Sequence, residues 1–203
     1  MAVDLTTTYA CPACPENCGD FVMPVIESED CLDSITSELS EIEQLFIASV
    51  DPADKTLPLN GPADWTLKSA WEAVIDNSSA TGIRRVYGIG DVGDPEKTTR
   101  TFHSNKTKVT GRKYTLTFDI LDMKQVNYDA MRKLQCGGSL RIWIMDRGGY
   151  LYGGQTGIPV NINDAESIFE RGADAYKKIV LKLEWTALCS PERTASPWSE
   201  VTP

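Results

Sequence analysis

Polar and apolar residues alternate in several short segments of the chain, which is the pattern of β-strands that bury one face. The alternation is clearest in KYTLTFDIL (113–121) and YKKIVLKLEWTAL (176–188). Shorter runs of the same kind are IRRVYGIG, SLRIWIM and GIPVNIN. The sequence DRGG supplies a glycine turn between SLRIWIM and the YLYGG run that follows it. These segments predict a body of mostly antiparallel strands.

Three further segments repeat apolar residues at intervals of three and four, as on one face of an α-helix. In residues 34–50 the repeating residues are Ile35, Leu39, Ile42, Leu45 and Phe46. The second segment is 65–75, with Asp64 as its N-cap, and the third is 127–136. We therefore expect one helix in the N-terminal region and two short helices in the body.

The 203 residues fall into four parts. Residues 1–50 form an acidic, cysteine-containing arm that ends in the expected helix. Residues 51–64, with three prolines and one glycine, are a linker. Residues 65–189 hold the strands and the two short helices. Residues 190–203 form a Ser- and Pro-rich tail that we expect to be mobile unless a partner holds it. The predicted fold class is α+β, mainly antiparallel β, with an extended or helical N-terminal arm.

The net charge of −9 is unevenly distributed. Residues 1–50 contain ten acidic residues and no Lys or Arg, whereas residues 51–203 contain nineteen acidic and twenty basic residues. Eight of these bases lie in residues 82–113, against three acids. The acidic arm can therefore pair with this basic segment, within one subunit or between copies. The same bases, with Tyr87, Phe102 and Tyr114 nearby, fit nucleic-acid binding as an alternative, which the negative net charge opposes.

No motif for a known catalytic mechanism stands out. The sequence GIGDVG (88–93) matches the glycine pattern of dinucleotide-binding loops, but Pro95 follows and no apolar helical stripe does. We therefore expect these glycines at a strand end or a β-bulge. The one histidine, His103, lies in a polar segment, where we expect it on the surface. We expect a protein that is not an enzyme, with an enzyme of unrecognised type as an alternative.

The cysteines give the strongest chemical signal. Cys11, Cys14 and Cys18 form C-x2-C-x3-C, and Cys31 follows after twelve residues. Four thiolates can close a tetrahedral zinc site, and C-x2-C is a common half of such a site. Free thiols and disulfides are the alternatives, because a reducing compartment disfavours disulfides unless the mature particle is later exposed outside the cell.

The compartment in which the chain folds bears on these alternatives. No apolar run approaches the roughly 18 residues that span a bilayer, so we expect no membrane partner. Residues 1–10 have neither a basic stretch nor an apolar core, so we expect no secretory signal. The chain is then expected to fold in a reducing cytosol, or alternatively to be a mature fragment. Cys136 and Cys189 lie beside a helix end and a strand end, where we expect buried structural thiols.

The body from about residue 65 to 198 resembles, in its order of elements, the tail-tube and tail-ring proteins of tailed bacteriophages. The resemblance is carried by KYTLTFDILDMKQVNYDAMRKLQCGGSLRIWIMDRGGYLYGG, GIPVNIN and YKKIVLKLEW. They give a long strand, a short helix, a strand, a glycine turn and a closing long strand. The resemblance implies a β-sandwich or partly closed barrel with a flanking helix, whose copies associate edge to edge into a ring. It does not predict the cysteine cluster.

In such families a long hairpin loop and a terminal arm reach the next ring or a neighbouring subunit, and residues 91–108 and 1–50 occupy those places here. The resemblance implies a virion subunit, made in the bacterial host cytoplasm, that forms a tail tube or neck ring around a DNA channel. Its partners would be copies of itself, neighbouring virion proteins, and DNA that passes without sequence-specific binding. The alternative is an adaptor that binds zinc through the four arm cysteines and contacts a partner.

Overall fold

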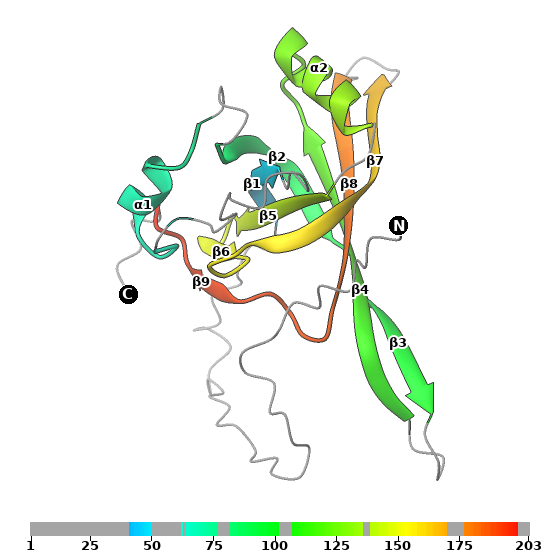
Figure 1. The fold of residues 1–203 in the computed structure, drawn as a ribbon. Helices are drawn as coiled ribbons and strands as arrows, with labels where there is room; N and C mark the ends of the chain where they lie inside the picture. Colours follow the sequence, from blue (N-terminus) through cyan, green and yellow to red (C-terminus); the bar gives the residue numbers. More distant parts are fainter. Residues whose placement is uncertain are drawn as a thin grey trace, which may run out of the picture.

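Six strands form a closed antiparallel barrel (Figure 1). In order around the barrel they are β1 (Ile42–Ser49), β2 (Arg84–Val92), β4 (Thr107–Ile120), β8 (Lys177–Ala187), β7 (Ile158–Phe169) and β5 (Ser139–Asp146). Pairing of β5 with β1 closes the ring of strands. The structure, a computed structural model, describes residues 41–49, 62, 64–76, 82–101, 107–135, 139–169 and 177–198.

The remaining elements attach to this barrel. Strand β3 (Glu96–Thr101) pairs with the first half of β4, and β6 (Tyr150–Tyr152) pairs with β5 and with β9 (Arg193–Ala195). Helix α1 (Lys68–Glu72) packs on the outside of the barrel, and α2 (Gln125–Leu134) connects β4 to β5. The predicted mainly antiparallel α+β fold is therefore confirmed. The β-sandwich alternative is wrong, because a single sheet closes on itself.

Alternation along the strands fills the inside of the barrel with apolar side chains. On β4 and β8 the buried interior residues are Tyr114, Leu116, Phe118, Ile179, Leu181, Leu183, Trp185 and Ala187. Helix α2 packs at the end of the barrel drawn uppermost in Figure 1, and its Met131 is buried against the same interior. The strands expected from alternation are thus confirmed, and so is the presence of two short helices in the body. The expected N-cap is wrong: α1 begins after Leu67, and Asp64 instead accepts hydrogen bonds from the backbone N–H and the hydroxyl of Thr66.

The helix expected over residues 34–50 is wrong in its described part, which forms strand β1. Both faces of β1 are buried: Leu45 faces the barrel interior, the adjacent Phe46 faces outward into a second cluster, and both are 0% exposed. A register shift between Ile42 and Gln44 also turns Ile42 to the same side as Leu45. Burial of both faces together with a bulge therefore reproduces the three- and four-residue spacing of a helix.

The second apolar cluster, here called the outer cluster, lies between the outside of the barrel and α1. Trp71 of α1 is 0% exposed, and its ring centroid lies 4.8 Å from that of Phe46 and 5.5 Å from that of Trp143. Its Nε1 donates a hydrogen bond to the carbonyl of Trp65 at 2.8 Å. Helix α1 has only five residues and no side-chain N-cap bond, so its intrinsic helix propensity is too weak to stabilise it. The packing of Trp71 stabilises it instead.

The tail, expected to be mobile, is part of the fold in its described residues 190–198. Strand β9 pairs with β6, and the backbone N–H of Ser196 donates to the carbonyl of Gly149 at 2.7 Å. Trp198 then stacks on Phe46, with ring centroids 5.0 Å apart. The prediction of mobility is wrong here, because a short strand and one aromatic side chain tie a Ser- and Pro-rich segment to the outer cluster.

Candidate functional site

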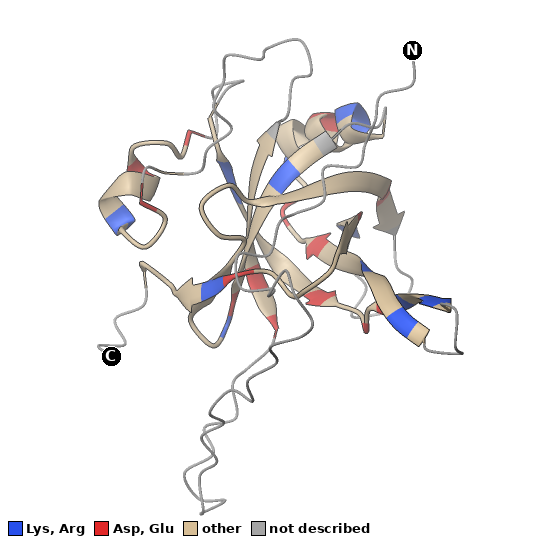
Figure 2. Cartoon of the chain, turned by 60° about the horizontal axis from the view of Figure 1, so that its bottom comes forward, with Lys and Arg blue, Asp and Glu red and all other residues tan. Residues whose placement is uncertain are grey.

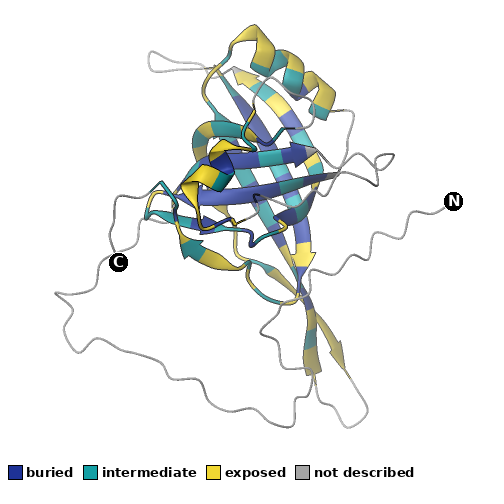
Figure 3. Cartoon of the chain, turned by 60° about the vertical axis from the view of Figure 1, so that its left-hand side comes forward, coloured by how far each residue is buried: buried dark blue, intermediate teal, exposed yellow. Residues whose placement is uncertain are grey.

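The first candidate is a two-stranded β-ribbon that projects from the barrel (Figure 1). Strand β4 pairs with β8 from Arg112 onward and with β2 from Leu116 onward, so its residues 107–111 pair with β3 alone. We call β3 together with residues 107–111 the ribbon. All six residues of β3 are exposed, and within 107–111 only Gly111 is buried. Figure 3 shows this part as mainly yellow against the dark blue barrel. The polar segment expected as a hairpin loop is therefore an extended hairpin.

Basic and hydroxyl side chains cover the ribbon. The two strands of the ribbon carry three exposed bases, Lys97, Arg100 and Lys108, and one acid, Glu96. Figure 2 colours the basic residues blue and the acidic residues red. The ribbon also carries threonines at positions 98, 99, 101, 107 and 110. At its base, Arg112 donates to the carbonyl of Leu188, and the Nζ of Lys113 lies 3.0 Å from a carboxylate oxygen of Glu184. The base is thus fixed to the end of β8, and the projecting part of the ribbon carries three basic residues and one acidic residue.

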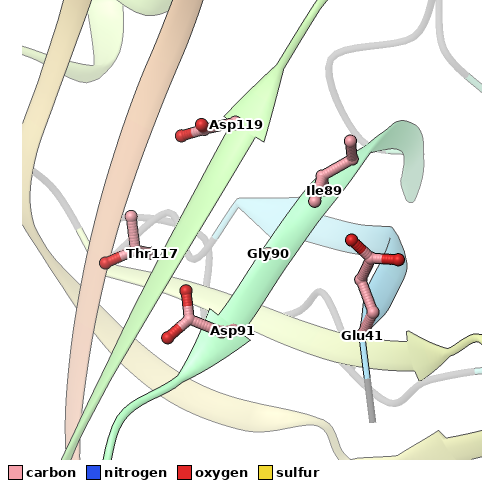
Figure 4. A pocket seen from close by; sticks show the side chains of 6 residues that line it. All are labelled: Glu41, Ile89, Gly90, Asp91, Thr117 and Asp119. Carbon is pink, nitrogen blue, oxygen red and sulfur yellow. The ribbon is translucent and has the colours of Figure 1, made fainter. Parts of the chain in front are cut away.

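The second candidate is a shallow hollow of about 340 Å³ on the outer face of β2 and β4 (Figure 4). We call it the hollow, and it is lined by Glu41, Ile89, Gly90, Asp91, Thr117 and Asp119. The β2–β4 register pairs Ile89 with Asp119 and Asp91 with Thr117, which brings these side chains to one patch of the sheet. Glu41 reaches the hollow from the residue before β1.

The three carboxylates of the hollow differ in their partners. Asp119 pairs with Lys178 at 2.8 Å, and Glu41 pairs with Arg147 at 2.8 Å. The Asp91 carboxylate is exposed and forms no hydrogen bond or ion pair with any described residue. The described residues include no group of three or more His, Cys, Asp or Glu side chains that could hold a metal ion. The hollow is therefore an open acidic surface patch with one unpaired carboxylate.

The glycine pattern at 88–93 belongs to strand β2, as expected. The register of β1 and β2 shifts beside Gly88, and β2 leads into Gly93 and β3 instead of a helix N-terminus. Gly88 and Gly90 leave room for the ring of Phe118 on β4 to pack against the β2 backbone. A Cβ on Gly88, for example, would lie 2.7 Å from Phe118 Cε1. The expectation of a β-bulge is confirmed. The glycines of GIGDVG allow β2 and the Phe118 side chain of β4 to approach closely.

Gly90→Ala is expected to lower the free energy of unfolding by about 1–3 kcal/mol. The new Cβ would lie 2.7 Å from Phe118 Cδ2 and 2.7 Å from the carbonyl oxygen of Thr117. Gly111→Ala is the matched control in the neighbouring strand, because its Cβ would meet only Thr186 Cγ2 at 3.5 Å. That variant should equal the wild type or gain up to about 1 kcal/mol. Urea unfolding followed by circular dichroism measures both, and equal losses would contradict the packing described.

The zinc prediction concerns residues that the structure does not describe. Cys11, Cys14, Cys18 and Cys31 all lie outside the described residues, so zinc at these positions stays a prediction. Cys189, expected as a buried free thiol, is partly exposed and disulfide-bonded. That expectation is wrong for Cys189, and the other five cysteines of the chain, Cys136 included, lie outside the described residues.

The basic and aromatic residues proposed for nucleic-acid binding do not form one surface. Tyr114 is 6% exposed and stacks on Trp185 inside the barrel, with ring centroids 5.1 Å apart. The guanidinium of Arg85 lies 4.8 Å from the ring of Trp198 and 2.6 Å from Gln44 Oε1, against the outer cluster. Tyr87 is 61% exposed on β2. Phe102, His103 and Lys106 lie outside the described residues.

A buried carboxylate near β6 has a structural role. Asp146 is 5% exposed and accepts hydrogen bonds from the backbone N–H of Tyr150 at 2.8 Å and from the Tyr152 hydroxyl at 2.9 Å. Burial and the bond to Asp146 raise the pKa of the Tyr152 hydroxyl above its usual value. The Arg193 guanidinium covers the Tyr150 ring at 4.1 Å. These contacts fix the β5–β6 turn and its partner strand β9.

The residues of the hollow were missed by sequence reasoning, because only strand register brings Asp91, Thr117 and Asp119 together.

None of the described helices is long and apolar enough to cross a membrane. A scan of the sequence against known protein families found no match, and a search of curated proteins found none either. The functional proposal therefore depends on the geometry of the ribbon and the hollow.

Proposed function

We propose that the chain is a structural subunit of a tailed-phage particle, without catalytic function, that self-associates into a ring or tube around a DNA channel. It would form a tail tube or a neck ring, contact neighbouring virion proteins, and let DNA pass without sequence-specific binding. The observation that carries the proposal is the ribbon, an exposed two-stranded extension whose outer edges pair with no other described strand.

The ribbon has features of a segment that is completed by a partner. A two-stranded hairpin without a hydrophobic face is marginally stable in water. The outer edge of β3 pairs with no other described strand, and neither does the opposite edge of residues 107–111. Such edges are templates for pairing with another chain, whereas a closed barrel has none of its own. Charged residues on the ribbon oppose nonspecific aggregation and favour a defined partner surface.

Self-association through the ribbon fits a cyclic assembly. The ribbon projects from one side of the barrel, so a contact between it and a different surface of another copy is heterologous. Heterologous contacts repeat from copy to copy, and they close into rings or continue as tubes. The barrel supplies a rigid body that holds each ribbon in a constant direction, as a regular ring requires.

Sedimentation velocity on the purified wild-type chain tests the proposal. We expect species several times heavier than the 22.4 kDa monomer, in a proportion that rises with protein concentration. Sedimentation as a 22.4 kDa monomer at every concentration tested would contradict a self-assembling subunit.

A further inference from the structure

We infer that Cys189 forms its disulfide with a cysteine of the N-terminal arm, which is one of Cys11, Cys14, Cys18 and Cys31. The bond joins the arm to the segment that follows β8, within one chain. The inference is independent of the proposed function, because it concerns the covalent structure of a single copy.

Cys189 has a defined place at one end of the barrel. It follows β8 by two residues, is partly exposed and is disulfide-bonded. The carbonyl of Leu188, the residue before it, accepts a hydrogen bond from Arg112 at the base of the ribbon. Cys189 also lines a small cavity together with Ile158 of β7 and Trp185 of β8. It therefore lies at the end of the barrel from which the ribbon projects (Figure 1).

Cys136 is too far away to be the partner. It follows Gln135 at the end of α2, and Gln135 donates a side-chain hydrogen bond to the carbonyl of Ala165 at 2.7 Å. Ala165 pairs with Leu181, which lies six residues before Ala187 on β8, or about 20 Å along the strand. A disulfide requires two Cα atoms within roughly 7 Å of each other. Helix α2 and the last residues of β8 are at opposite ends of the barrel (Figure 1).

Elimination of Cys136 leaves the arm as the source of the partner. The chain has six cysteines, and apart from Cys136 and Cys189 all of them lie in residues 1–40. The partner of Cys189 within the chain is therefore an arm cysteine.

The arm is long enough to reach Cys189. Ile42 at the start of β1 pairs with Asp146 of β5, and Ile158, beside Cys189, pairs with the β5 residue four positions before Asp146. Two strand spacings and four residues along β5 add up to about 23 Å. Cys31 lies eleven residues before Ile42, and eleven extended residues span about 36 Å. Even the arm cysteine nearest to the barrel in the sequence is therefore within reach.

The bond has a consequence for the alternative of a zinc-binding adaptor. One of the four arm sulfurs would be held in the disulfide, so it could not act as a thiolate ligand. The three remaining arm cysteines do not complete a tetrahedral site of four thiolates. A disulfide of this kind fits a chain that persists in an oxidising environment, as a mature particle outside the cell does.

Tryptic mapping without reductant tests the inference. The purified chain is equilibrated in a mixture of reduced and oxidised glutathione, and the remaining thiols are blocked with N-ethylmaleimide. Because no Lys or Arg precedes residue 55, trypsin leaves all the arm cysteines in one peptide, residues 1–55. Cys189 lies in the tryptic peptide 183–193, and Cys136 lies in 134–141.

We expect mass spectrometry to find peptide 1–55 joined to peptide 183–193, and we expect dithiothreitol to separate the two. A second digestion that cleaves after glutamate then identifies the arm cysteine. Cleavage after Glu16 separates Cys11 and Cys14 from Cys18, and cleavage after Glu27 separates Cys18 from Cys31.

Cys136→Ser is the matched control for Cys189→Ser. The Cys136→Ser chain should give the same linked peptides as the wild type, whereas the Cys189→Ser chain should give none that contain residues 183–193. On a non-reducing gel the linked wild type should migrate as a single 22.4 kDa chain, because the bond forms within one copy.

Three results would each overturn the inference. They are a link between peptides 183–193 and 134–141, a Cys189 that carries N-ethylmaleimide or glutathione, and a linked pair that occurs only in a disulfide-bonded dimer. Failure of the inference would leave the proposed function intact, because self-association is measured separately by sedimentation.

Discussion

Trp71→Ala is expected to lower the free energy of unfolding by about 3–5 kcal/mol, the largest stability effect that we predict for one side chain. The substitution leaves a cavity where the indole contacted Phe46, Trp143 and Trp198, and it removes the hydrogen bond to the Trp65 carbonyl. Because the five-residue α1 is held by this packing, it should detach from the barrel. Far-UV circular dichroism during urea unfolding gives the free energy.

Lys68→Ala is the matched control in the same helix. The Lys68 side chain is 58% exposed, and its ion pair with Glu72 spans 3.8 Å, so its removal should cost at most about 0.5 kcal/mol. A loss below about 1 kcal/mol for Trp71→Ala, or equal losses for the two variants, would contradict the role given to the outer cluster.

Shortening the ribbon should abolish assembly while leaving the barrel folded. Lys97 and Arg112 are opposite each other in the β3–β4 register, so residues 98–111 can be replaced by Asn-Gly, a preferred two-residue hairpin turn. Among the described residues of the removed segment only Gly111 is buried, so the free energy of unfolding should change by less than about 1 kcal/mol. Sedimentation should show a monomer at concentrations where the wild type assembles.

A second variant separates the ribbon's edges from its charges. Thr99→Pro lies in the middle of β3 and removes one backbone N–H while it keeps every base of the ribbon. If strand pairing with a neighbour contributes, this variant should assemble less than the wild type but more than the shortened chain. Wild-type assembly by the shortened chain would exclude the ribbon as the contact.

The strands of the body could be predicted because each buries one face. In β8, and in β4 from Tyr114 onward, every second side chain enters the barrel, so alternation in the sequence follows burial directly. The glycines of β2 were assigned correctly because Pro95 and the polar residues after them exclude a helix. Local sequence patterns therefore predicted the secondary structure where a strand buries only one face.

The structures of β1 and of the tail could not be predicted, because they depend on contacts with distant segments of the chain. Leu45 and Phe46 are adjacent and both fully buried, on opposite faces, and a bulge brings Ile42 to the same side as Leu45. No single-segment pattern separates that arrangement from a helix. Trp198 belongs to the outer cluster only because β9 pairs with β6 far back along the chain.

The candidate site was also out of reach of sequence reasoning. The basic segment was recognised as a group of charges, but strand register separates the ribbon bases from Arg85 and buries Tyr114. The hollow joins Glu41 to Asp91 and Asp119, which are fifty and more residues away. Long-range strand pairing sets such neighbours, and the pattern within a single segment does not reveal which strands will pair.

Electron microscopy of wild-type and ribbon-shortened chains, prepared side by side at the same concentration, tests the central claim most directly. The proposal predicts annular particles or tubes with a central hole for the wild type and only small single particles for the shortened chain. Small single particles in the wild-type sample, or rings in both samples, would contradict a subunit that assembles through its ribbon.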